Sequence, residues 1–151
     1  MSEISGRPAP QPAVVARQLL RSRPWGEVVG LVLAAAVVQL AFTGRTDWPA
    51  HLLAGGGAVL VVVAAAPGAV RPWAAPAAIG GVAVLGVVSE ILWVGPFDPL
   101  DIAFTMVGGL FVASATPVEP GGRARRTTAL VGLALLGIAV WYRYGVPLDQ
   151  R

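Results

Sequence analysis

The chain has 151 residues, of which 56% are hydrophobic and 13% are charged. Soluble domains carry about 25% charged residues, so this composition argues against a water-soluble domain, and the high hydrophobic share excludes a disordered chain. The lack of cysteine excludes disulfide scaffolds, thiolate metal sites and cysteine nucleophiles. Basic residues, all of them arginine, outnumber acidic ones by 11 to 8, an excess that we assign to membrane topology and not to nucleic-acid binding.

Residues 1–24 are the longest polar stretch, and we expect them to form a basic, proline-rich cytoplasmic tail. Pro8, Pro10 and Pro12 favour an extended first half. The second half, residues 13–23, has two interpretations: a short amphipathic helix whose arginines face anionic head groups, or an unstructured basic tail.

Five apolar runs follow, at about 25–42, 49–66, 74–94, 100–115 and 127–144. A bilayer core about 30 Å thick needs about 20 helical residues, and backbone groups in hydrocarbon must form hydrogen bonds within their own segment. We therefore predict an all-α fold, an integral membrane bundle of five transmembrane helices over residues 25–144, whose fourth span is short. Residues 145–151 would form a short extracytoplasmic tail.

Tryptophan, proline and small residues support these spans. The tryptophans lie at span ends, where amphipathic indoles prefer the membrane interface: Trp25, Trp48, Trp73, Trp93 and Trp141. Prolines lie in the tail, in connections or in first turns, the last group being Pro49, Pro76 and Pro99. Small residues four apart indicate close helix packing at Ala54/Ala58, Ala77/Gly81 and Gly109/Ala113.

The distribution of arginine predicts the orientation. With a cytoplasmic N-terminus, the cytoplasmic segments hold Arg7, Arg17, Arg21, Arg23, Arg71, Arg123, Arg125 and Arg126, and the opposite side holds Arg45, Arg143 and Arg151. This positive-inside bias predicts a multi-pass protein of the plasma membrane with its C-terminus outside. Because residues 41–43 are a poor cleavage site, we expect the first span to be an uncleaved anchor.

This topology brings one set of polar residues to the extracytoplasmic face, with Gln39 nearby: Asp47, His51, Glu90, Asp98 and Asp101. We predict that they form an acidic, outward-facing pocket with one histidine. Most of them also have a structural interpretation. Asp98 before Pro99 fits a helix N-cap, Asp101 then falls where an acid favours the helix dipole, and Asp47 could cap the second span. His51 could be an interfacial histidine, whereas Glu90 has no local capping role.

The acids at Glu90, Asp98 and Asp101, together with the Asp-x-x-x-His element from Asp47 to His51, resemble the VanZ-like family of small multi-pass bacterial membrane proteins. The resemblance covers residues 25–116. It implies a bacterial plasma membrane location and a link to cell-envelope processes or glycopeptide resistance, but no particular reaction. Thr105 stands where the family has Asn, and Trp93 stands where a polar residue usually follows the Glu. Both departures remove polar groups from the expected site.

Four functions remain open. The first is binding of a lipid-linked envelope molecule, through attraction of a cationic group or a divalent cation, for which carboxylates suit Ca²⁺ or Mg²⁺ and His51 would permit Zn²⁺ or Mn²⁺. The second is a metal-assisted or acid/base hydrolase with His51 as the base, although only Arg45 is close by to hold a phosphate. The third is a proton-linked transporter, which lacks charged residues in mid-span. The fourth is a structural or assembly protein. We assign no cofactor, favour no enzyme class, and leave the oligomeric state and protein partners open.

Overall fold

The computed structural model describes residues 25–92, 98–113 and 122–145, apart from the side chains of Arg71, Ser89 and Glu90. Within these ranges the protein is all-α, as predicted, and has no strand. The long helices are α2 (Trp25–Ala41), α3 (Asp47–Ala65), α4 (Arg71–Leu92), α5 (Pro99–Ala113) and α6 (Gly122–Val140). A 3₁₀ turn, Gly68–Val70, precedes α4, and a π-helical turn, Trp141–Gly145, extends α6.

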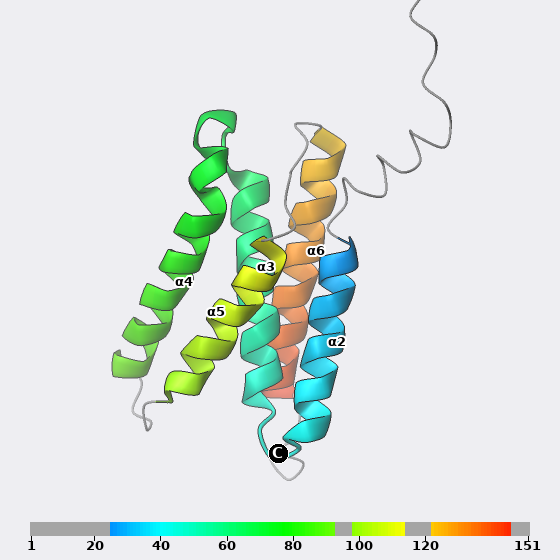
Figure 1. Ribbon diagram of the computed structural model, residues 1–151, viewed down its shortest axis with the longest axis vertical. Coiled ribbons are helices and arrows are strands. Elements are labelled where there is room, and N and C mark those ends of the chain that lie inside the picture. Colours follow the sequence, from blue (N-terminus) through cyan, green and yellow to red (C-terminus); the bar gives the residue numbers. More distant parts are fainter. Residues whose placement is uncertain (1–24, 93–97, 114–121, 146–151) are drawn as a thin grey trace, which may run out of the picture.

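Successive helices run in opposite directions, so the fold is an up-and-down bundle in which α3 and α5 run parallel to each other (Figure 1). The central element is α3, which packs against α2, α4, α5 and α6. Most of its residues are buried, including Leu52, Val59 and Leu60. The beginnings of α3 and α5 and the ends of α2, α4 and α6 therefore meet at one end of the bundle.

Three helices begin earlier than the apolar runs. Asp47 opens α3, Arg71 opens α4 and Gly122 opens α6. The apolar criterion detects only the part of a helix that is free of polar residues, whereas first turns accept polar residues readily. The prediction that Pro76 lies in a first turn is consequently wrong, because Pro76 is inside α4.

Glycines bring α3 into backbone contact with two neighbours. A Cβ atom on Gly55 would overlap the carbonyl oxygen of Thr105 in α5, and one on Gly108 would overlap that of Leu52. On the other side of α3, a Cβ atom on Gly57 would lie 2.8 Å from the carbonyl oxygen of Gly132 in α6. Only glycine permits this approach, which is how small residues act at close helix crossings.

The small-residue pairs predicted from spacing only partly locate these contacts. Gly109 does face α3, since a Cβ atom there would lie 3.1 Å from Val59. Gly81 faces open space, with no atom within 4 Å of its built Cβ position, so it forms no helix contact in the monomer.

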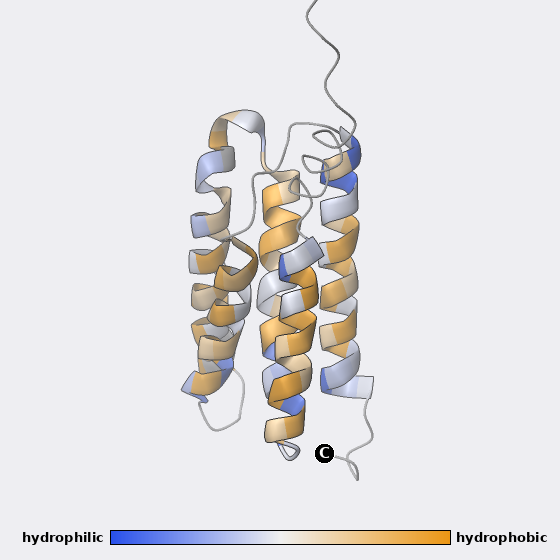
Figure 2. Ribbon diagram, turned by 45° about the vertical axis from the view of Figure 1, so that its right-hand side comes forward, coloured by the Kyte–Doolittle hydropathy of each residue, from blue (hydrophilic) through white to orange (hydrophobic). Residues whose placement is uncertain are grey.

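The outer surface of the bundle is apolar. Large side chains are exposed along the outer faces of the helices, among them Leu40 at 78%, Leu92 at 75% and Trp73 at 72%. Hydrophobic residues cover the helix bodies, while the most hydrophilic residues gather mainly at the helix ends (Figure 2). Two stretches, Asp47–Ala65 and Gly122–Gly145, are long and apolar enough to cross a membrane; Trp25–Ala41, Pro72–Val88 and Pro99–Ala113 are apolar but shorter.

Arg125 of α6 closes the C-terminal end of α3. Its Nε atom donates to the carbonyl oxygen of Ala64 at 2.8 Å, and its Nη2 atom donates to those of Ala65 and Ala66, both at 3.1 Å. The last carbonyls of a helix have no partner within it, and a cation there also complements the helix dipole. This contact fixes α6 against α3 at the end opposite Asp47.

We predict that Gly108→Ala lowers the free energy of unfolding by about 1–3 kcal/mol, because the added methyl group forces the α3 and α5 backbones apart. Gly81→Ala is the matched control. It adds the same methyl group within a helix but into open space, and should be neutral or slightly stabilising. Thermal unfolding in detergent, followed by circular dichroism, measures both. Equal melting temperatures for the two variants would contradict the packing described here.

Candidate functional site

Six side chains meet at the end of the bundle where α3 and α5 begin, and we call them the polar cluster: Arg45, Asp47, His51, Asp98, Asp101 and Thr105. Arg45 comes from the turn between α2 and α3. Asp98 directly precedes α5, and the other four lie in the first turns of α3 or α5. The structure thus brings together four of the five predicted site residues.

Arg45 is the centre of the polar cluster. Its Nε and Nη2 atoms donate to the two carboxylate oxygens of Asp47 at 3.2 and 3.1 Å. The same Nη2 atom pairs with Asp98 and lies 3.9 Å from Asp101. One oxygen from each of the three aspartates lies within 4.8 Å of the others, a spacing that could hold a metal ion. The guanidinium of Arg45 already supplies the positive charge among them.

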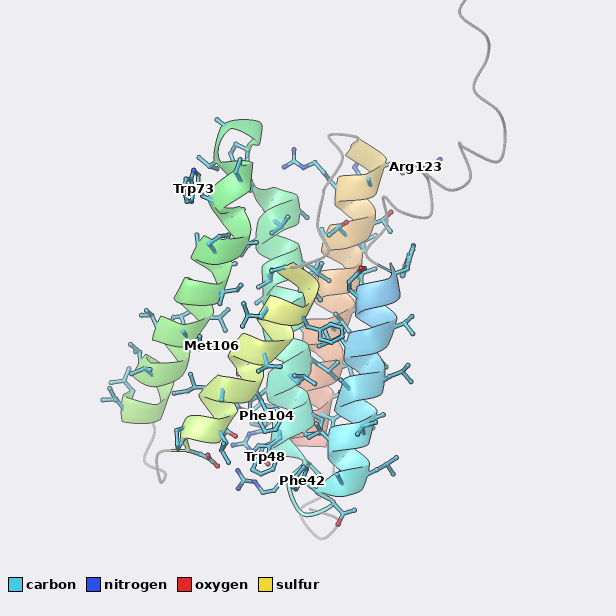
Figure 3. All side chains as sticks on the ribbon, viewed as in Figure 1. Phe42, Trp48, Trp73, Phe104, Met106 and Arg123 are labelled. Atoms are coloured by element: carbon cyan, nitrogen blue, oxygen red, sulfur yellow. The ribbon has the colours of Figure 1, made fainter. Side chains whose placement is uncertain are left out.

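An aromatic group supports Arg45. The guanidinium lies over the ring of Trp48, 4.3 Å from its centroid, in a cation–π arrangement. Trp48 stacks on Phe104 at 5.1 Å and meets the edge of Phe42 at 5.0 Å. The three rings lie together at this end of the bundle, while Trp73 and Arg123 mark the opposite end (Figure 3). The guanidinium is therefore held by carboxylates and by a ring face.

His51 joins α3 to α5 through both of its ring nitrogens. The Nε2 atom lies 3.2 Å from Oδ2 of Asp101, and the Nδ1 atom lies 3.1 Å from Oγ1 of Thr105. The hydroxyl of Thr105 donates in turn to the backbone carbonyl of Asp101 at 2.7 Å. In this arrangement no ring nitrogen of His51 is left over for a substrate.

The structural roles considered for the aspartates are met to different degrees. Asp98 caps α5, since its Oδ1 atom accepts a hydrogen bond from the amide of Leu100 at 2.9 Å, as the sequence suggested. Asp101 lies in the first turn of α5 and additionally contacts His51. Asp47 is itself the first residue of α3, and its printed side-chain hydrogen bonds are to Arg45.

Two other predicted participants are less informative. Glu90 belongs to the last turns of α4, so its backbone lies at the same end of the bundle, but its side chain is outside the described part of the structure. Gln39 does not join the polar cluster by any hydrogen bond. Its Oε1 atom is buried and has no hydrogen-bond partner among the described residues.

Two members of the polar cluster were undervalued from the sequence. Arg45 appeared only as a nearby cation, although it contacts all three aspartates. Thr105 appeared as the loss of a polar group, and this interpretation is wrong, because its hydroxyl contacts His51. Its position four residues after Asp101, on the same helix face, was the available signal.

The polar cluster is partly open to its surroundings and is unequally charged. The exposed fraction of the side chain falls from 39% for Arg45 and 30% for His51 to 9% for Asp101. Pairing with Arg45 lowers the pKa of Asp98, and the aspartates keep the pKa of Arg45 above its usual range. Three carboxylates surround one guanidinium, so pairing inside the cluster leaves an excess of negative charge unless His51 is protonated.

We predict that Arg45→Gln lowers the free energy of unfolding at neutral pH by about 1–2 kcal/mol, since the half-exposed aspartates lose their charged donor. The lowered pKa of Asp98 means that its contribution exists above its unfolded-state pKa and is lost as the pH falls through the folded value. The gap between wild type and variant should therefore shrink as the pH falls below the ordinary aspartate value of 3.8. Arg126→Gln, at the opposite end, is the control. A gap that is unchanged in acid would contradict this account.

No protein-family model, curated protein or solved structure matches the chain. The resemblance to VanZ-like proteins, which depends on short motifs, stays a prediction. What the protein does must therefore be argued from the polar cluster and from the apolar surface around the bundle.

Proposed function

We propose that the protein is a five-span protein of the bacterial plasma membrane, with its N-terminus in the cytoplasm and its C-terminus outside. In this proposal the polar cluster faces the outer leaflet and binds a cationic group on a lipid-linked molecule of the cell envelope. The observation that carries the proposal is the excess of carboxylate over guanidinium in a partly exposed cluster at the end of an apolar bundle.

The exposed apolar surface supports a membrane location. Side chains such as Leu33, Leu85 and Ile91 are 60–71% exposed, on α2 and α4. Soluble proteins rarely expose large continuous apolar patches, because their hydration is unfavourable. In a bilayer the same side chains contact acyl chains, and the close backbone packing around α3 supplies the attraction between helices.

The short helices are compatible with five spans. At a rise of about 1.5 Å per residue, the 17 residues of α2 extend about 26 Å and the 15 residues of α5 about 22 Å. Both fall short of a core of about 30 Å, and local thinning of the bilayer accommodates such mismatch at modest cost. Packing of α5 against α2, α3 and α4 also shields part of its length from lipid.

The charge imbalance supports a cationic ligand. Carboxylates removed from water are stabilised only when they are paired, and a second cation would complete the pairing that Arg45 begins. An ammonium group is a suitable cation, because it is a compact charge with several hydrogen-bond donors. Asp98, at 27% side-chain exposure, is the more accessible carboxylate of the pair that it forms with Asp101.

A structural role is the second candidate. The contacts of Arg45 and His51 connect the start of α3 to the start of α5, so the polar cluster could serve only to join these helices. The hydrolase is less well supported, because both ring nitrogens of the base candidate His51 are engaged. The binding experiment below separates the first two candidates.

Single-cysteine labelling of this cysteine-free chain tests the topology. Gly44→Cys, in the turn before α3, should react with a membrane-impermeant maleimide added outside intact spheroplasts. Gly68→Cys, in the turn before α4, should react only after the membrane is opened. Neither position has an atom within 4 Å of its built Cβ, so neither substitution disturbs packing. Labelling of both sites from outside, or of Gly68→Cys alone, would contradict the proposed topology.

Asp98→Asn tests the binding site, because Asn keeps an N-cap acceptor but removes the charge. We expect the wild type in nanodiscs to retain phosphatidylethanolamine over phosphatidylcholine, as measured by native mass spectrometry, since only the former offers ammonium hydrogens. Asp98→Asn should reduce this preference about tenfold, equivalent to about 1.4 kcal/mol. Arg126→Gln should leave it unchanged. A wild type without any preference would favour the structural role.

A further inference from the structure

We propose that His51, Asp101 and Thr105 form a proton-dependent latch between α3 and α5, which is closed only while both ring nitrogens of His51 carry a hydrogen. The latch itself follows from the hydrogen bonds and does not depend on the proposed ligand. Its effect on cation binding, described below, does rest on the proposed function.

The hydrogen on Nδ1 follows from the hydrogen bonds of Thr105. A threonine hydroxyl has a single hydrogen, and this one points at the carbonyl oxygen of Asp101, which can only accept. The oxygen of Thr105 can therefore act only as an acceptor toward His51. The Nδ1 atom must be the donor, so it carries a hydrogen.

The hydrogen on Nε2 follows from the carboxylate. An ionised carboxylate accepts hydrogen bonds and cannot donate them, so the 3.2 Å contact with Asp101 requires a hydrogen between the two groups. Carboxylic acids are stronger acids than imidazolium, which places this hydrogen on the ring. His51 is thus an imidazolium when both contacts are made.

Loss of this proton opens the latch. A neutral ring with its hydrogen on Nδ1 would turn the lone pair of Nε2 toward Asp101, and the contact between α3 and α5 would become repulsive. If the hydrogen stayed on Nε2 instead, the contact with Thr105 would be lost. The stabilisation that the latch provides is therefore present below the pH at which His51 titrates and disappears above it.

Several other charged groups act on His51. From the turn before α3 comes Arg45, from α3 itself Asp47, and from the start of α5 Asp98 and Asp101. Arg143, in the turn that extends α6, acts on Asp47. The α4 helix contributes Glu90 near this end of the bundle, with a side chain outside the described part. The carboxylates outnumber the cations, which favours the protonated ring.

The proton also changes the charge that a ligand meets. With His51 protonated, the described part of the polar cluster carries three negative and two positive charges; without that proton the excess of negative charge grows from one to two. If the proposed ammonium ligand binds here, the ligand and the proton compete. Binding should strengthen as His51 loses its proton, unless opening of the latch disassembles the site.

His51 is the chain's single histidine, so ¹⁵N-histidine labelling reports the latch without any assignment. In detergent micelles, we expect both ring nitrogens to show protonated shifts at the acid end of a titration from about pH 5 to about pH 9. One nitrogen should lose its hydrogen as the pH rises, and the melting temperature should fall with the same midpoint. Asp101→Asn should move that midpoint to lower pH, because it removes the adjacent negative charge.

The variants distinguish a latch from an ordinary surface histidine. His51→Gln should abolish the pH dependence of the melting temperature over this range, and Arg126→Gln should leave it unchanged. The proposal is overturned if the ring titrates without a change in melting temperature, if it does not titrate, or if Asp101→Asn leaves the midpoint in place. If His51→Gln does not fold, the midpoint of Asp101→Asn still decides. A pH-independent preference for phosphatidylethanolamine would remove the coupling to the ligand but not the latch.

Discussion

The close approach of α3 and α5 is the constraint on which the site depends. Gly55 lies against the carbonyl of Thr105, and Gly108 lies against the carbonyl of Leu52, so neither helix can slide past the other without a backbone collision. This register places His51, one turn before Gly55, opposite Asp101 and Thr105. The chemistry at the end of the bundle is thus a consequence of glycine packing in its interior.

The same interior explains why charge can gather at this end. Apolar helices that cross a bilayer need polar partners only where they leave the hydrocarbon, and the first turns of α3 and α5 both lie there. Arg45, from the connecting turn, compensates part of the negative charge that these two first turns bring together. A cation tethered to a short turn neutralises the cluster without placing an arginine inside any helix.

The sequence predicted much of this fold, because its strongest signals are local. The apolar runs, together with the tryptophans and prolines, located the helices to within a few residues, with the largest error at the start of α6. The grouping of Asp47, His51, Asp98 and Asp101 followed from topology alone. The central position of Arg45, the contact of Thr105 with His51, and the glycines that touch across helices depend on the rotation of each helix about its axis. The pattern within one helix does not contain that information.

The bonds between Arg125 and the end of α3 have a consequence for how the protein fits its lipids. Guanidinium groups lie at both ends of α3, Arg45 beside its first turn and Arg125 on its last carbonyls. For a bundle placed in a bilayer as proposed, these two groups bound the hydrocarbon layer, and the 19 residues of α3 set its thickness at about 28 Å. Acyl chains that form a layer of this thickness would need the least deformation around the protein. The central helix, which is mostly shielded from lipid, would in this way select the lipids that surround it.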